Sequence, residues 1–138
     1  MVAATPSLAP TLDAVRLFLH VAAATVWVGG QIVMLGLVPA ARNLGDGAPR
    51  VLANAFARLA WPAFVLLVVT GFWNISAVGK GGTAWEAVLG VKLAVVALSG
   101  LAAWLHGRAT SRSQLALWGS VSGSASIVAL FLGILLAG

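Results

Sequence analysis

The chain contains no cysteine and very little charge. Its 138 residues include three acidic and eight basic side chains, and 61% of them are hydrophobic. The lack of cysteine excludes disulfides and thiolate metal sites. A soluble domain of this size needs far more surface charge, so the composition excludes an ordinary soluble protein. We therefore expect one domain, residues 1–138, that lies in a lipid bilayer.

Recognisable catalytic and nucleic-acid motifs are also missing. The chain has no P-loop, no Gly-x-Ser-x-Gly and no His-Glu-x-x-His. The net charge of +5 is spread over single basic residues rather than a cluster, which argues against nucleic-acid binding. We expect a protein that is not an enzyme; the enzyme class that stays open is a haem- or quinone-linked oxidoreductase.

Four apolar stretches are long enough to cross a bilayer, which takes about 20 helical residues. They lie near residues 14–38, 58–78, 86–106 and 115–137. Polar, glycine-rich segments separate them. The pattern predicts an all-α integral membrane protein that folds as a four-transmembrane-helix bundle.

The basic residues predict the orientation of these helices. Five arginines fall in or beside the first and third connections: Arg42, Arg50, Arg58, Arg108 and Arg112. Because cytoplasmic loops carry an excess of Lys and Arg, we expect loops 39–57 and 107–114 in the cytoplasm. Both termini then lie on the outer side of a multi-pass protein of the cytoplasmic membrane.

Three polar side chains are predicted at one depth. His20, Asn74 and Lys92 all fall roughly 6–9 Å below the outer boundary at 1.5 Å per helical residue. An ionisable group inside an apolar span is costly and marks a candidate site. His20 is either a ligand for a metal or haem, or a structural histidine bonded to a neighbouring helix.

The other two residues of this level also have two interpretations each. Lys92 either extends its ammonium to the interface or provides a fixed cation for a carboxylate. Asn74 either forms an interhelical hydrogen bond or positions a ligand.

A stripe on the first helix adds candidates. Trp27, Gln31 and Met34 follow His20 at helical spacing, so Trp27 joins the candidate cofactor site and Met34 the candidate metal ligands. His106 lies at the opposite end of the third span. We interpret it as interfacial, and a second metal or haem site there stays open.

Small residues form one face of the fourth span. Gly119, Ser120, Gly123 and Ser124 allow close helix approach. This face predicts packing within the bundle or a homodimer.

These residues resemble the copper-resistance D (CopD) membrane domain. The resemblance rests on His20 with 27–30 (Trp-Val-Gly-Gly), 71–74 (Gly-Phe-Trp-Asn) and 91–93 (Val-Lys-Leu), and covers roughly residues 13–106. It implies a membrane protein that handles copper during uptake or tolerance. His20 would bind the copper ion, with Met34 and Asn74 as weaker candidates.

A second family is similar at fewer positions. The HemJ-type protoporphyrinogen oxidases share a first-span histidine, a nearby tryptophan and a third-span lysine, and His20 and Lys92 match those positions. That similarity implies haem b, with His20 as axial ligand and Lys92 near a propionate. A structural subunit of a larger membrane complex is the third hypothesis.

Overall fold

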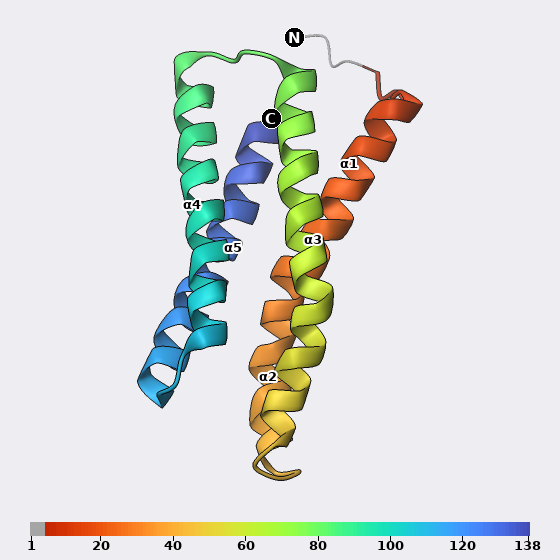
Figure 1. The fold of residues 1–138 in the computed structure, drawn as a ribbon. Helices are drawn as coiled ribbons and strands as arrows, with labels where there is room; N and C mark the ends of the chain where they lie inside the picture. Colours follow the sequence, from red (N-terminus) through yellow and green to blue (C-terminus); the bar gives the residue numbers. More distant parts are fainter. Residues whose placement is uncertain (1–4) are drawn as a thin grey trace.

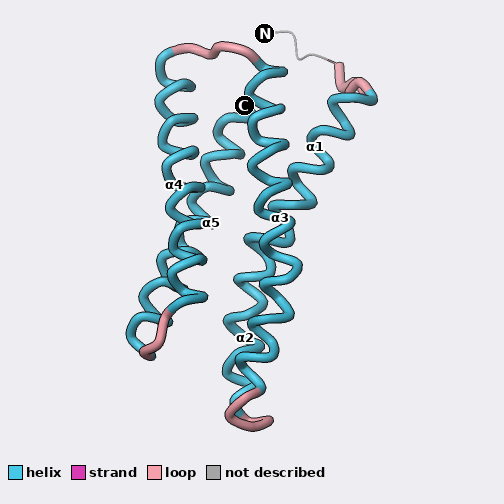
Figure 2. The backbone as a smooth tube through the Cα atoms, viewed as in Figure 1, coloured by secondary structure: helices cyan, strands magenta, loops and turns pink. Residues whose placement is uncertain are grey.

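The computed structural model describes residues 5–138, which are helical except for residues 5–10 and short connections (Figures 1 and 2). In chain order the helices are α1 (Thr11–Ala24), the π-helical η1 (Thr25–Gly29), α2 (Gly30–Arg42), α3 (Ala48–Val78), α4 (Thr83–Arg108) and α5 (Arg112–Ala137). The first three form one continuous rod. Four rods are therefore long and apolar enough to cross a membrane, which confirms the all-α class and the four candidate spans.

The predicted cytoplasmic loops are much shorter in the structure. α3 begins at Ala48, so the predicted loop 39–57 is only a turn over residues 43–47. Gly45 has a φ of 122°, which allows the chain to reverse, and Pro49 lies in the first turn of α3, where a missing N–H costs little. Residues 48–57 are therefore helical, although their polar residues predicted a loop.

The second predicted loop, 107–114, is reduced in the same way. α4 ends at Arg108 and α5 begins at Arg112. Ser111 caps α5, because its hydroxyl accepts a hydrogen bond from the backbone N–H of Gln114 at 3.2 Å.

The helices pack as two antiparallel pairs. One pair is the α1–η1–α2 rod with α3, and the other is α4 with α5 (Figures 1 and 2). The two pairs meet where η1 contacts α5. The middle of the first rod therefore holds the two halves of the protein together.

A π-helical turn shapes this meeting point. A π turn carries an additional residue, so it rotates the residues that follow relative to an uninterrupted α-helix. Trp27 is buried within η1 and packs on α3, with ring centroids 4.4 Å from Phe64 and 5.6 Å from Trp61. Gly30 follows at close approach, since a Cβ there would lie 2.2 Å from the ring of Phe56.

Four polar side chains connect the helix pairs at this point. The indole N–H of Trp27 donates to the Ser99 hydroxyl at 3.1 Å, and Ser99 donates to the carbonyl of Ser122 at 3.1 Å. Ser122 donates to the carbonyl of Ser99 at 2.9 Å and to Oε1 of Gln31 at 3.0 Å. Gln31 in turn donates to the carbonyl of Trp27 at 3.1 Å. This central network gives the indole N–H of Trp27 a partner within the protein.

Candidate functional site

His20 and Thr70 form the centre of the candidate site. Nδ1 of His20, on α1, lies 2.9 Å from the hydroxyl oxygen of Thr70, on α3. Thr70 is 1% exposed, and the His20 ring also lies against Gly71, where a Cβ would be 3.5 Å from Cε1. The imidazole is therefore held on one edge by α3.

The bonds of Thr70 determine which ring nitrogen carries the proton. The Thr70 hydroxyl donates to the backbone carbonyls of Leu66 at 2.7 Å and Leu67 at 3.2 Å. A hydroxyl has one hydrogen, so towards His20 it accepts. We therefore assign the hydrogen to Nδ1 of His20, which leaves the lone pair on Nε2.

Arg16 lies one turn from His20 and forms a hydrogen bond with Asn74. A nitrogen of the buried Arg16 guanidinium donates to Oδ1 of Asn74, and another donates to Asp13 at 2.9 Å. Asn74 therefore accepts a hydrogen bond from the neighbouring helix. Its interhelical hydrogen bond, one of the two interpretations of this residue, is the one present.

The two contacts form a ladder between α1 and α3. Arg16 and His20 are four residues apart on α1, and Asn74 and Thr70 are four apart on α3. In antiparallel helices, residues at this spacing meet turn by turn. The sequence contained part of this signal, because each helix has two polar residues four positions apart. The contact between α1 and α3 is needed to show which residue pairs with which.

Lys92 lies on α4, in the other helix pair. Its ammonium lies against α5, because a Cβ at Gly133 would be 2.9 Å from Nζ. Within residues 5–138 the only salt bridge joins Arg16 to Asp13, so Lys92 has no carboxylate partner there. An ammonium in this position suits an anionic group.

Met34 lies far from His20. The sequence stripe puts both on one face, but fourteen helical residues correspond to about 21 Å along the rod. The π turn between them also rotates the two faces apart. Met34 therefore does not reach an ion bound by His20 within a single chain. Across residues 5–138, no group of three His, Cys, Asp or Glu side chains is close enough to hold a metal ion.

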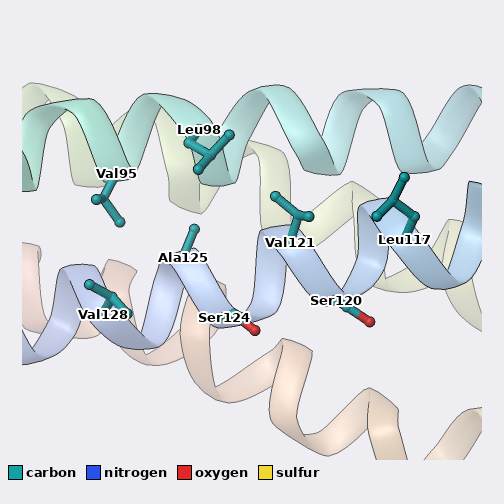
Figure 3. A pocket seen from close by; sticks show the side chains of 8 residues that line it. All are labelled: Val95, Leu98, Leu117, Ser120, Val121, Ser124, Ala125 and Val128. Carbon is teal, nitrogen blue, oxygen red and sulfur yellow. The ribbon is translucent and has the colours of Figure 1, made fainter.

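The small-residue face of α5 is divided between inside and outside. Gly119 lies against His106, and Gly123 has Oε1 of Gln31 3.8 Å from its Cβ position. Ser120 and Ser124 are exposed beside a shallow groove of about 420 Å³ between α4 and α5. Figure 3 shows their hydroxyls pointing away from α4. Half of the predicted dimer face is thus used within the chain.

Comparison with known proteins returns no relative. No family model, no curated protein and no solved structure matches this chain.

Proposed function

We propose that this chain handles copper in a membrane as a CopD-like protein, and that Nε2 of His20 binds the metal ion. The observation that supports the proposal is the hydrogen bond between His20 and Thr70. Histidines that bind metals usually donate their other ring N–H to an oxygen, which fixes the tautomer and the direction of the free nitrogen. Thr70 supplies that oxygen inside an apolar span.

The site is open rather than closed. His20 supplies one nitrogen, and it belongs to no group of three His, Cys, Asp or Glu side chains among the described residues. Copper binds imidazole well, whereas tight Cu(I) sites use soft sulfur ligands. A single imidazole holds copper weakly and releases it readily, which suits a protein that passes the ion on. The other ligands would come from water or from the molecule that delivers the copper.

Haem b is the second candidate, and Lys92 is the observation that favours it. The Lys92 ammonium has no carboxylate partner among the described residues, and such a charge attracts a propionate. One imidazole with a fixed N–H is also sufficient as an axial ligand. In that case His20 would hold the iron, Lys92 would hold a propionate, and the haem would supply electron transfer.

The variant His20→Asn tests both candidates. The Asn amide retains an N–H that can donate to Thr70, but it has no ligating nitrogen. The full chain is purified in detergent, its copper and iron contents are measured after copper loading, and its absorption spectrum is recorded. Copper in the wild-type chain that falls in His20→Asn supports the proposal. A Soret band that disappears in His20→Asn supports haem instead.

A matched variant controls for folding. Val21→Ala changes a neighbouring side chain that is 61% exposed on the outside of the same helix. It should retain whatever the wild-type chain binds. A wild-type chain that binds neither copper nor haem would overturn both candidates and leave the structural-subunit hypothesis.

We propose the cytoplasmic membrane as the location, with both termini on the outer side. The support is the excess of arginine near the 43–47 and 109–111 connections. On this orientation His20 lies near the outer face.

A homodimer through α5 would use Ser120 and Ser124, because Gly119 and Gly123 face other helices of the same chain. Size-exclusion chromatography with light scattering of wild type and Ser124→Leu tests it.

A further inference from the structure

An apolar groove lies between α2 and α3 beside the turn that joins them. It has a volume of about 540 Å³, and its lining is entirely apolar. The lining includes Leu37 and Ala41 on α2, Leu44 in the turn, and Val51 and Ala55 on α3. Leu44 is 83% exposed and Val51 is 70% exposed. The chain therefore leaves large apolar side chains uncovered along this groove.

Arginines flank the groove on both helices. Arg42 directly follows Ala41 on α2, and Arg50 directly precedes Val51 on α3, so each lies beside a lining residue. Both arginines are exposed. Neither takes part in a salt bridge among residues 5–138, although Asp46 lies in the turn between them. The groove therefore has an apolar interior and a cationic rim.

The length of the helices places this groove at the depth of the lipid headgroups. The first rod has 32 residues and α3 has 31, which correspond to about 48 and 46 Å. A hydrocarbon core of about 30 Å, centred on these rods, covers about 20 residues of each and leaves roughly six at either end. At the turn these are residues 37–42 and 48–53, and Figure 1 shows this turn beyond the connection between α4 and α5. Hydrocarbon alone therefore does not cover Leu44 and Val51, and such an exposed apolar surface indicates a binding site.

A phospholipid matches both parts of this surface. An acyl chain fits an apolar groove that runs from the turn towards the core at Ala55. A phosphate fits guanidinium groups, which donate two parallel N–H bonds to its oxygens. A second copy of the chain would bring the same arginines against Arg42 and Arg50, and like charges repel. Charge complementarity therefore favours a lipid with a net negative charge.

We propose that the groove between α2 and α3 binds one anionic phospholipid, with an acyl chain along the groove and the phosphate on Arg42 and Arg50. The lipid would stabilise the folded chain by mass action, because the groove exists only when α2 and α3 are paired. The site does not depend on what His20 binds. It is also the same whichever end of the helices faces the cytoplasm.

Native mass spectrometry of the full chain tests the site. The chain is released from nanodiscs that contain equal amounts of phosphatidylglycerol and phosphatidylcholine. We expect one bound phosphatidylglycerol per chain in preference to phosphatidylcholine. Arg42→Gln and Arg50→Gln should each lower this preference about fivefold, the effect of one basic residue near a charged membrane surface. Equal retention of the two lipids by the wild-type chain would overturn the proposal.

The matched control for charge is Arg112→Gln. Arg112 is exposed at the start of α5, near the same end of the molecule, and does not line the groove. Its substitution removes the same charge and should leave the lipid preference unchanged. An equal loss in Arg112→Gln would mean that the charge of the whole end attracts lipid, and would refute a site in the groove.

A variant that fills the groove tests the place of the acyl chain. Val51→Trp puts a large side chain at an exposed lining position and should displace the lipid. Its control is Val128→Trp in the groove between α4 and α5, whose lining carries no charge, and this variant should retain the lipid (Figure 3). Phosphatidylglycerol that stays bound to Val51→Trp would contradict the proposal. A dimer in the same spectra that Val51→Trp dissociates would show that a second copy occupies the groove instead.

Discussion

Ser99 and Ser122 each donate their hydroxyl to the backbone carbonyl of the other, at 3.1 Å and 2.9 Å. This reciprocal pair joins α4 to α5, and Trp27 and Gln31 connect it to the first rod. The described residues contain no buried side-chain nitrogen or oxygen without a partner. The centre of the protein is therefore a satisfied hydrogen-bond network, which rigidifies the packing.

Ser99→Ala should destabilise the protein by about 1 kcal/mol. The substitution leaves the indole N–H of Trp27 and the carbonyl of Ser122 without their partners in an apolar setting. Membrane hydrogen bonds average about 0.6 kcal/mol, and here two are lost. Unfolding in mixed micelles with increasing SDS measures the change. Ser120→Ala, at an exposed position, is the control, and equal effects of the two substitutions would contradict the role of the network.

Thr70→Val should release the tautomer of His20. Valine has nearly the same shape as threonine but no hydroxyl, so Nδ1 loses its acceptor. We expect ¹⁵N shifts that report a mixture of tautomers, and copper or haem affinity reduced about 10–100-fold. Thr70→Ser restores the hydroxyl and should rescue both. Unchanged ¹⁵N shifts in Thr70→Val would show that another contact orients the ring.

Asn74→Leu should cost about 1–3 kcal/mol of stability. The buried Arg16 guanidinium loses an acceptor on α3 and retains only Asp13 on its own helix. The matched control is Asn54→Leu, because Asn54 is exposed on the same helix. The SDS unfolding assay compares them. A loss that is no larger for Asn74→Leu than for Asn54→Leu would show that the ladder between α1 and α3 contributes little.

Single cysteines report the orientation without background, since the natural chain has none. A cysteine at Ser7 should react with an impermeant maleimide in intact cells. A cysteine at Asp46, in the connection between α2 and α3, should react only after the membrane is permeabilised. The excess of arginine on that side is the physical reason. The reverse labelling pattern would place His20 near the cytoplasmic face.

Residue types and their order were enough to predict four membrane-spanning helices. Long apolar stretches have no alternative in a bilayer, where helices satisfy their own backbone hydrogen bonds. The ends of α3 were not predictable in this way, because its first turns from Ala48 carry polar residues that read as loop. Helix packing and Pro49 at the first turn decide that boundary.

The candidate site shows the same division. His20 and Lys92 stand out in the sequence because each places an ionisable group in an apolar span, which is costly wherever it occurs. Only the contact between α1 and α3 shows that His20 bonds to Thr70 and that Arg16 bonds to Asn74. Only the length of the rod and its π turn separate Met34 from His20. Composition and periodicity determine what each helix buries, whereas the partners of each side chain depend on helix register, which residues distant in the chain establish together.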